Sequence, residues 1–333
     1  MKNKFLQYVI SVCIVGLLQG CAAKDNSAYF AAYEKNYKMK APYTTHWVQR
    51  DGFSIHVREY GTAGNKPTII MMHGFPDSMH LYDQLIPNLM HERHIITFDF
   101  IGWGDSSKPK EYNYNVESLR HDLEAVVAFF KLDQVVLVVH DASGQPGIDW
   151  ALEHPEKTAG LVLLNTYYGP MKTLKAPEAI ELFSTPGIQR DLAVWATSYF
   201  DALWIKRYNE QMAKFISTPE LRESFQKVLG YQSLETRPAF YALNRVLRDE
   251  VKKREQKKNE LQQFKKPVRI IFGNDDPYLN AGVAQVFHQT FPNSELFLIK
   301  EAGHFVQVDK PKKVADLLRN FPDTSGDNHT IMK

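Results

Sequence analysis

The chain has 333 residues, of which 44% are hydrophobic and 23% charged, and its 40 basic residues nearly balance its 38 acidic ones. This is the composition of a globular protein that can bury a large core, with no low-complexity tract or internal repeat. Because the formal net charge is only +2 and no basic face stands out, we expect no binding of nucleic acid.

The first twenty residues are typical of a signal peptide. Two lysines precede residues 8–18, an uncharged and mostly apolar stretch that is too short to span a membrane. The following tetrapeptide LQGC at 18–21 resembles the lipobox of bacterial lipoproteins, in which the signal is cut before a cysteine that is then lipid-modified. The resemblance implies a lipid anchor at Cys21. The Ala22 that follows implies that the protein is anchored in the outer membrane and faces the periplasm. A plain secretory signal with a chance cysteine is the alternative.

Cysteine usage agrees with this prediction. The chain has two cysteines, Cys13 and Cys21. Cleavage of segment 1–20 and acylation of Cys21 would leave a protein without thiol or disulfide, which suits an oxidising periplasm and excludes cysteine catalysis. Residues 21–44, polar and irregular, are expected to form a tether.

Strands and helices then alternate along the chain. Segments 46–50 and 53–60 predict a β-hairpin around a tight Asp-Gly turn. Further strands are predicted at 68–72, 94–98, 135–139, 161–164, 268–272 and 296–299, and helices at 81–90, 116–130, 148–153, 281–291 and 312–321. Continuous apolar strands of this kind belong in a parallel sheet covered on both faces.

The alternation is interrupted by a long helical block. Residues 170–263 are rich in Phe, Tyr, Leu and Lys and show no clear strand. A helical block inserted into an α/β sheet is a lid or cap, so we expect one α/β core formed by 45–169 and 264–325, with a helical cap at 170–263 between the two pieces.

Polar residues follow several of the predicted strands, where open α/β sheets place their sites. Asp141, Asp276 and His304 each come shortly after a strand. This order of nucleophile, acid and histidine resembles the α/β-hydrolase superfamily. The His-Gly-x-Pro loop at 73–76 and the Asp-x-x-Gly-x-Gly-x-Ser segment at 99–106 are similar to its haloalkane dehalogenase and epoxide hydrolase branches. The resemblance covers roughly residues 45 to 322, and the cap is its weakest part.

Two residues compete for the role of nucleophile. The turn between strand and helix that carries the nucleophile crowds its flanks and favours small residues. Around Asp141 the flanks are Val139 and Ser143, whereas around Ser143 they are Asp141 and Gln145. Ser143 also lies four residues beyond the strand. This geometry favours Asp141, and a helix N-cap is its plain structural alternative.

The resemblance implies a role for each of the other site residues. His304 would be the general base, and Asp276 would orient it, because the family spacing Gly-x-x-Asp selects Asp276 over Asp275. Backbone N–H groups of Phe75 and Ala142 would hold the oxyanion. We expect neither a cofactor nor a metal, since His91 and His94, three residues apart, have no further ligand cluster near them in the sequence.

An aspartate nucleophile restricts the substrate. Attack of a carboxylate on an acyl carbon would give an anhydride, a poor intermediate. Attack on a saturated carbon that carries a halide or an epoxide oxygen gives an ordinary ester, which water can then hydrolyse. We therefore expect a small apolar substrate with an epoxide or a carbon–halogen bond.

The sequence departs from the dehalogenase pattern next to the nucleophile. Dehalogenases usually have a tryptophan there that binds the departing halide, and this chain has Ala142. Epoxide hydrolases use cap tyrosines to protonate the opening oxygen, which places epoxide opening slightly ahead. The candidate cap donors are Tyr199, Tyr208, Tyr231, Tyr241, Trp195 and Trp204.

Two other interpretations stay open at this stage. One is a serine-type esterase that uses Ser143. The other is a non-catalytic binding lipoprotein on a hydrolase scaffold, because a fold alone does not establish activity. The oligomeric state is left open by the sequence.

Overall fold

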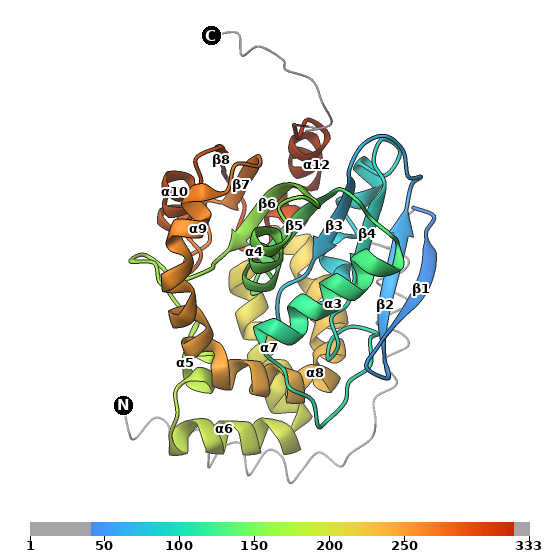
Figure 1. The fold of residues 1–333 in the computed structure, drawn as a ribbon. Coiled ribbons are helices and arrows are strands. Elements are labelled where there is room, and N and C mark those ends of the chain that lie inside the picture. Colours follow the sequence, from blue (N-terminus) through green and yellow to red (C-terminus); the bar gives the residue numbers. More distant parts are fainter. Residues whose placement is uncertain (1–40, 323–333) are drawn as a thin grey trace.

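A computed structural model describes residues 41–322 and is built on one eight-stranded sheet (Figure 1). The strand order is β1-β2-β4-β3-β5-β6-β7-β8. The strands are β1 (Thr44–Arg50), β2 (Phe53–Tyr60), β3 (Thr68–Met72), β4 (Ile95–Phe98), β5 (Val135–Asp141), β6 (Thr158–Thr166), β7 (Val268–Gly273) and β8 (Ser294–Ile299). The predicted signal peptide, Cys21 and most of the predicted tether lie outside the described residues.

The predicted α/β-hydrolase sheet is confirmed. β1 and β2 form the antiparallel hairpin around the Asp51-Gly52 turn, and β2 pairs antiparallel with β4. From β4 onward, neighbouring strands are parallel, so the carboxyl ends of β3 to β8 meet at one edge. That edge collects the polar residues that follow the strands.

Helices cover both faces of the sheet. α3 (Val116–Phe129), α4 (Gly144–Glu153) and α10 (Ala281–Thr290) pack on one face, where they bury strand residues such as Met72 and Val139. The short helices η1 (Met79–Tyr82) and η2 (Ile86–Asn88), with α11 (Val306–Asp309) and α12 (Pro311–Arg319), cover the other face, which presents Met71 and Val138. Successive strand residues point to opposite faces, which produces these two clusters.

One predicted helix is absent. Residues 81–90 were expected to form a regular helix, but they form turns and short 3₁₀ segments, η1 and η2. Pro87 lies inside η2, and proline supplies no N–H to an α-helical hydrogen bond. The helix predicted at 116–130 is present, and the Asn115 side chain caps it by accepting a hydrogen bond from Ser118 N–H (2.8 Å).

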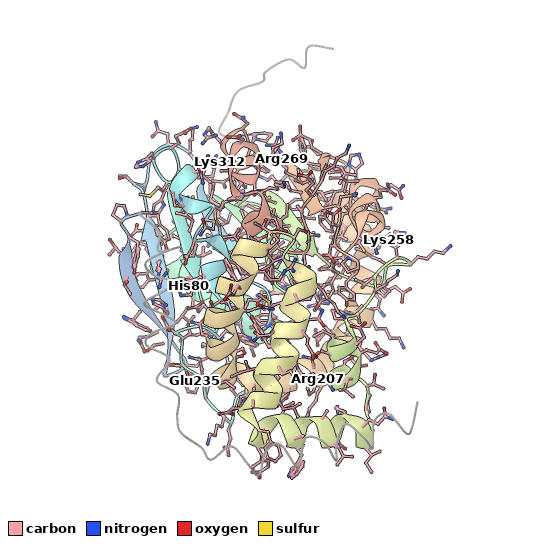
Figure 2. The ribbon with its side chains drawn as sticks, turned by 180° about the vertical axis from the view of Figure 1, so that it is seen from behind. His80, Arg207, Glu235, Lys258, Arg269 and Lys312 are labelled. Carbon is pink, nitrogen blue, oxygen red and sulfur yellow. The ribbon has the colours of Figure 1, made fainter. Side chains whose placement is uncertain are left out.

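Between β6 and β7 the chain is helical, at the place where the cap is expected. The cap helices are α5 (Glu178–Ser184), α6 (Ile188–Tyr199), α7 (Asp201–Phe215), α8 (Pro219–Lys253), η3 (Arg254–Lys257) and α9 (Lys258–Gln263). Figure 2, seen from behind, shows α7 and the first part of α8 running side by side, with Arg207 and Glu235 near the end that lies closest to α6. No helix within residues 41–322 is long and apolar enough to cross a membrane.

A buried ion-pair cluster joins the cap helices to the core. Asp149 on α4 pairs with Arg254, which begins η3, and with Lys257 (2.9 Å), and it accepts a hydrogen bond from the Tyr168 hydroxyl (2.6 Å). Asp149 and Arg254 are both buried. Removal of one partner from a buried pair leaves the other charge uncompensated, which is costly.

The Asp149→Ala substitution should therefore lower the free energy of unfolding by about 3 kcal/mol, as measured by urea denaturation. Asp316→Ala is the matched control, because Asp316 pairs with Arg319 on the exposed side of α12 and exposed pairs add little to stability. Equal losses in the two variants would show that the Asp149 cluster does not hold the cap to the core.

Candidate active site

Asp141 occupies a sharp turn between β5 and α4. Its φ is +51°, in the left-handed region that residues other than glycine rarely adopt. The turn is crowded: a Cβ on Gly144 would lie 2.0 Å from Thr166 Oγ1, and one on Gly74 would lie 2.5 Å from the Asp141 Cβ. Such a strained turn, permitted by small neighbours, presents a side chain at the carboxyl edge of the sheet.

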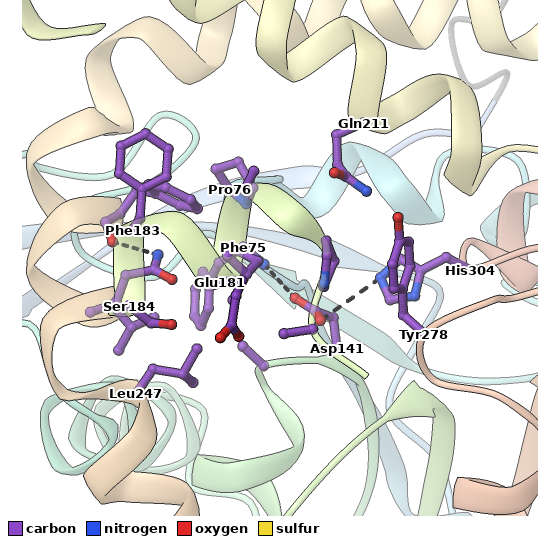
Figure 3. Close-up of a pocket in the computed structure, with 18 of the residues that line it drawn as sticks. Phe75, Pro76, Asp141, Glu181, Phe183, Ser184, Gln211, Leu247, Tyr278 and His304 are labelled. Atoms are coloured by element: carbon purple, nitrogen blue, oxygen red, sulfur yellow. Dashed lines mark hydrogen bonds and ion pairs between the residues drawn. The ribbon is translucent and has the colours of Figure 1, made fainter. Parts of the chain in front are cut away.

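The structure brings the three residues Asp141, Asp276 and His304 together. His304 Nδ1 lies 2.7 Å from Asp276 Oδ2, and His304 Nε2 lies 3.8 Å from Asp141 Oδ1. Phe75 N–H donates to Asp141 Oδ2 at 3.1 Å. Figure 3 shows Asp141 between Phe75 and His304. Asp141 is the last residue of β5, and Asp276 and His304 lie in the loops after β7 and β8, so the parallel sheet itself places the three side chains at one edge.

Burial and charge shift the ionisation of these groups. Burial raises the pKa of Asp141 above its ordinary value, against the opposing effects of His304 and the Phe75 and Ala142 N–H groups. Burial would lower the pKa of His304, but the charge and hydrogen bond of Asp276 prevail and raise it, with a further contribution from Asp141. Burial opposes ionisation of Asp276, yet His304 and the N–H groups of Tyr278 and Leu279 hold its pKa below the ordinary value.

A further residue, Asn165 at the end of β6, supports Asp276. Its side-chain amide donates to Asp276 Oδ2 at 3.0 Å, and its carbonyl oxygen accepts from Gly273 N–H at 2.7 Å. Asn165 is buried and has a positive φ of 26°. Asn165 is not among the site residues predicted from the sequence, although its position as a polar residue at a strand end is a signal that could have identified it.

Ser143 and Asp275, the sequence alternatives to Asp141 and Asp276, do not line the cavity. Ser143 is buried, and its hydroxyl is hydrogen-bonded to backbone groups of His140 (2.7 and 2.9 Å) and Met72 (3.0 Å). Asp275 is exposed at the turn after β7, whereas Asp276 is buried beside His304. Through these hydrogen bonds, Ser143 ties the turn after β5 to β3.

Two histidines beside the site hold backbone segments in place. The His140 ring lies 3.1 Å from the His304 carbonyl oxygen through Nε2, and burial holds the pKa of His140 well below its ordinary value. The His73 ring accepts a hydrogen bond from Phe100 N–H (3.2 Å). Both side chains are fully buried. They support the loops that carry His304 and Phe100.

A cavity of about 420 Å³ lies over Asp141, between the cap helices and the carboxyl edge of the sheet. Its walls are mostly apolar, with contributions from α5, α7 and α8 such as Phe183, Met212 and Leu247. Asp141 and His304 form part of its lining. A cavity of this size and character accepts a small apolar molecule.

The predicted cap donors divide between the cavity and the rest of the cap. Tyr208 and Trp204 line the cavity, but the Trp204 indole N–H donates to Ser233 Oγ at 2.8 Å. Tyr241 is buried with its hydroxyl 2.7 Å from Thr197 Oγ1 and does not line the cavity. Trp195 and Tyr199 are exposed on α6, outside the cavity. The side chain of Tyr231 lies outside what the structure describes.

Two polar groups in the cavity were not anticipated. The Tyr208 hydroxyl donates to Asp77 Oδ1 at 2.9 Å, and burial raises the pKa of Asp77 to about 7, although that hydrogen bond acts to lower it. Gln211, one turn along α7, has a buried side-chain N–H₂ without a hydrogen-bond partner. Figure 3 shows Gln211 projecting into the space that Asp141 and His304 face. Asp77 follows the His-Gly-Phe-Pro motif directly, which is the signal that could have identified it.

One group of side chains has the spacing of a metal site. Among residues 41–322, His56, Asp99 and Asp105 lie close enough to share a cation. However, the Asp99 carboxylate already accepts hydrogen bonds from Met79 and Asp105 N–H groups (2.8 and 3.0 Å). Through these hydrogen bonds, Asp99 holds the loop after β4 in place.

Comparisons with known proteins agree with this architecture. The model of the alpha/beta hydrolase fold family matches residues 67–311. Haloalkane dehalogenase 2 of Mycobacterium bovis is 24% identical over 82% of this chain and 93% of its own length. Bifunctional epoxide hydrolase 2 of Sus scrofa is 24% identical over 95% of this chain and 60% of its own length.

A solved structure shares the fold. The crystal structure of a membrane phospholipase A, described as a bacterial virulence factor, aligns with a TM-score of 0.72 at 20% identity, over 96% of this chain and 97% of that one. At this identity the likeness concerns the fold alone. From the family match over most of the chain, together with the sheet and its strand-end residues, we conclude that the protein is a hydrolase that belongs to the alpha/beta hydrolase fold family.

Proposed function

We propose that this hydrolase opens epoxides on small apolar molecules by forming an ester on Asp141. The observation that carries the proposal is the arrangement of Asp141, with one carboxylate oxygen on the Phe75 N–H (3.1 Å) and the other 3.8 Å from His304 Nε2. A serine esterase is not favoured, because the Ser143 hydroxyl is engaged by backbone groups.

The first step forms the ester. A carboxylate oxygen of Asp141 attacks a ring carbon of the epoxide, the carbon–oxygen bond of the ring breaks, and the released oxygen takes up a proton. In the second step, water attacks the Asp141 carbonyl carbon and gives its proton to His304. The negative oxygen that develops is met by the Phe75 and Ala142 N–H groups. The bond between the Asp141 carbonyl carbon and the alkyl oxygen then breaks, that oxygen takes the proton from His304, and the diol leaves with Asp141 regenerated.

The charge of Asp141 would control the basicity of His304 during this cycle. In the resting enzyme, Asp276 and Asp141 both raise the pKa of His304. Ester formation neutralises Asp141 and removes one of these contributions, so the pKa of His304 falls when a neutral imidazole is needed to accept a proton from water. Asp276 remains to stabilise the imidazolium that follows.

Epoxide opening is preferred over dehalogenation because a proton donor lines the cavity. An opening epoxide oxygen needs a proton, whereas a departing halide needs only N–H or O–H groups that solvate it. Tyr208 donates to Asp77, whose pKa of about 7 lets this pair hold an extra proton near neutral pH. In the proposed step Asp77 is protonated and donates to the Tyr208 oxygen, so that the Tyr208 proton passes to the substrate oxygen and the Asp77 proton replaces it.

Carbon–halogen cleavage is the second candidate, and Gln211 is the observation that favours it. Its unpartnered N–H₂ group faces the cavity and could solvate a halide without transferring a proton. Haloalkanes and epoxides should therefore be assayed side by side on the same variants.

The covalent step predicts that His304→Gln accumulates the ester. Intact-protein mass spectrometry after incubation with a turned-over epoxide should show one added substrate mass, and peptide mapping should locate it on Asp141. Ser143→Ala is the control and should keep turning over, while Asp141→Ala should be inactive. Ester or epoxide hydrolysis that survives Asp141→Ala would move the chemistry to another residue.

The electrostatic coupling predicts the titration of His304. In NMR titrations of the imidazole signals, the pKa of His304 should lie above 6.5 in the wild type and should fall in Asp141→Asn, since that variant removes a negative charge beside Nε2. Asp276→Asn should lower it further, because Asp276 makes the larger contribution. An unchanged pKa in Asp141→Asn would contradict the proposed change in basicity.

If Tyr208 is the proton donor, its removal should affect epoxides more than haloalkanes. Tyr208→Phe should slow epoxide opening on the order of 10²-fold, the usual contribution of a general acid, and should leave any halide release much less affected. Tyr241→Phe is the matched control, since Tyr241 is buried in the cap but bonded to Thr197. Pre-steady-state ester formation measures the step directly, and equal rates in the two variants would exclude Tyr208 as the acid.

A further inference from the structure

The outer side of α6 carries a row of large exposed hydrophobic side chains. Ile188, Leu192, Trp195 and Tyr199 keep 76%, 44%, 51% and 73% of their surface exposed. At about 100° per residue, all four fall within a sector of about 60° around the helix axis. Figure 1 shows α6 at the outer end of the cap helices, away from the sheet. The row is therefore one continuous stripe on the surface, which we call the α6 stripe.

The α6 stripe is separate from the core that α6 helps to form. The opposite side of the helix packs inward, where Ala193 and Val194 contact the cluster around Phe183 and Trp204. The only charged residues of α6 are Arg190 and Asp191, and they pair with each other at 3.0 Å. A helix that buries one apolar side and exposes another, with its charges paired, presents an apolar surface that another molecule or a membrane can cover.

We propose that the α6 stripe docks on the surface of a lipid bilayer. Two aliphatic residues followed by Trp195 and Tyr199 have the composition of a membrane-interface helix, in which aromatic rings lie at the level of the headgroups. The chain carries an independent membrane signal, the apolar segment 8–18 followed by the lipobox-like sequence that ends at Cys21. A bilayer is therefore the occupant that both features share.

The chain between these two features is long enough for both to reach one membrane. Residues 22–40 separate Cys21 from Ala41, the first described residue. Nineteen residues span at most about 65 Å when extended, which exceeds the diameter of roughly 50 Å expected for a compact domain the size of residues 41–322. A lipid anchor at Cys21 would hold the protein at the membrane without orienting it, and the α6 stripe would turn the cap toward the lipid.

Docking would bring the apolar cavity close to a lipid phase. α6 packs against α5 and α7, and both of these helices line the cavity over Asp141. Apolar molecules concentrate in bilayers, so in this orientation an apolar substrate would enter the cavity from the membrane. The docking proposal does not depend on which bond the enzyme breaks, and its test needs no turnover.

Two tryptophans allow a direct test on the full chain. Trp195 and Trp47 are equally exposed, at 51% each, but Trp47 lies on β1. The full chain is bound to vesicles of phosphatidylethanolamine and phosphatidylglycerol whose acyl chains carry bromine, which quenches tryptophan fluorescence on contact. Quenching should disappear in Trp195→Phe and persist in Trp47→Phe. No quenching in the wild type, or quenching that depends on Trp47, would overturn the proposal.

A second variant separates the bilayer from other occupants. Ile188→Ser combined with Leu192→Ser should reduce the vesicle-docked fraction, read from Trp195 quenching, by roughly tenfold, because two exposed aliphatic side chains no longer enter the lipid. Sedimentation with the vesicles reports the anchor separately, and an unchanged circular dichroism spectrum verifies folding. If the wild type instead forms a dimer in gel filtration that this variant dissociates, a second copy covers the stripe and the bilayer proposal fails.

Discussion

The left-handed turn at Asp141 is the constraint on which the rest of the site depends. A residue with a side chain adopts a φ of +51° there, and the surrounding structure must hold it. Gly74 and Gly144 leave the space that the turn needs, and Ser143 ties its backbone to β3. In return, the carboxylate stands at the edge of the sheet with a backbone donor, Phe75 N–H, already directed at it.

The second organising feature is the number of carboxylates around one imidazole. Asp276 contacts His304 directly, Asp141 faces its other nitrogen, and Asp77 acts on it from a greater distance. Burial makes each of these charges more effective, because little water screens them. The basicity of His304 therefore depends on the state of its neighbours, which is what the proposed two-step mechanism requires of its base.

The cap helices serve two surfaces. Their inner sides close an apolar cavity over Asp141 and contribute Tyr208 and Gln211 to it. The outer side of α6 leaves Trp195 and Tyr199 in solvent. Aromatic residues are abundant on both sides, so composition alone does not distinguish a residue that contacts substrate from one that faces outward. The buried Asp149 cluster fixes the base of this block to the core and so sets the position of the cavity walls.

The sequence by itself determined the sheet and the residues at its edge. Buried parallel strands appear as apolar runs, and the residues that follow them meet at one edge, so the polar strand ends could be grouped without coordinates. The resemblance to the α/β-hydrolase superfamily then selected Asp141, Asp276 and His304 among them. Only the tertiary structure decided which cap residues enter the cavity, which partners Asn165 and Asp77 bind, and that residues 81–90 form turns instead of a helix. The reason is physical: strand-end positions follow from local pattern and sheet geometry, whereas the direction of a cap side chain depends on how whole helices pack against each other, which no local pattern specifies.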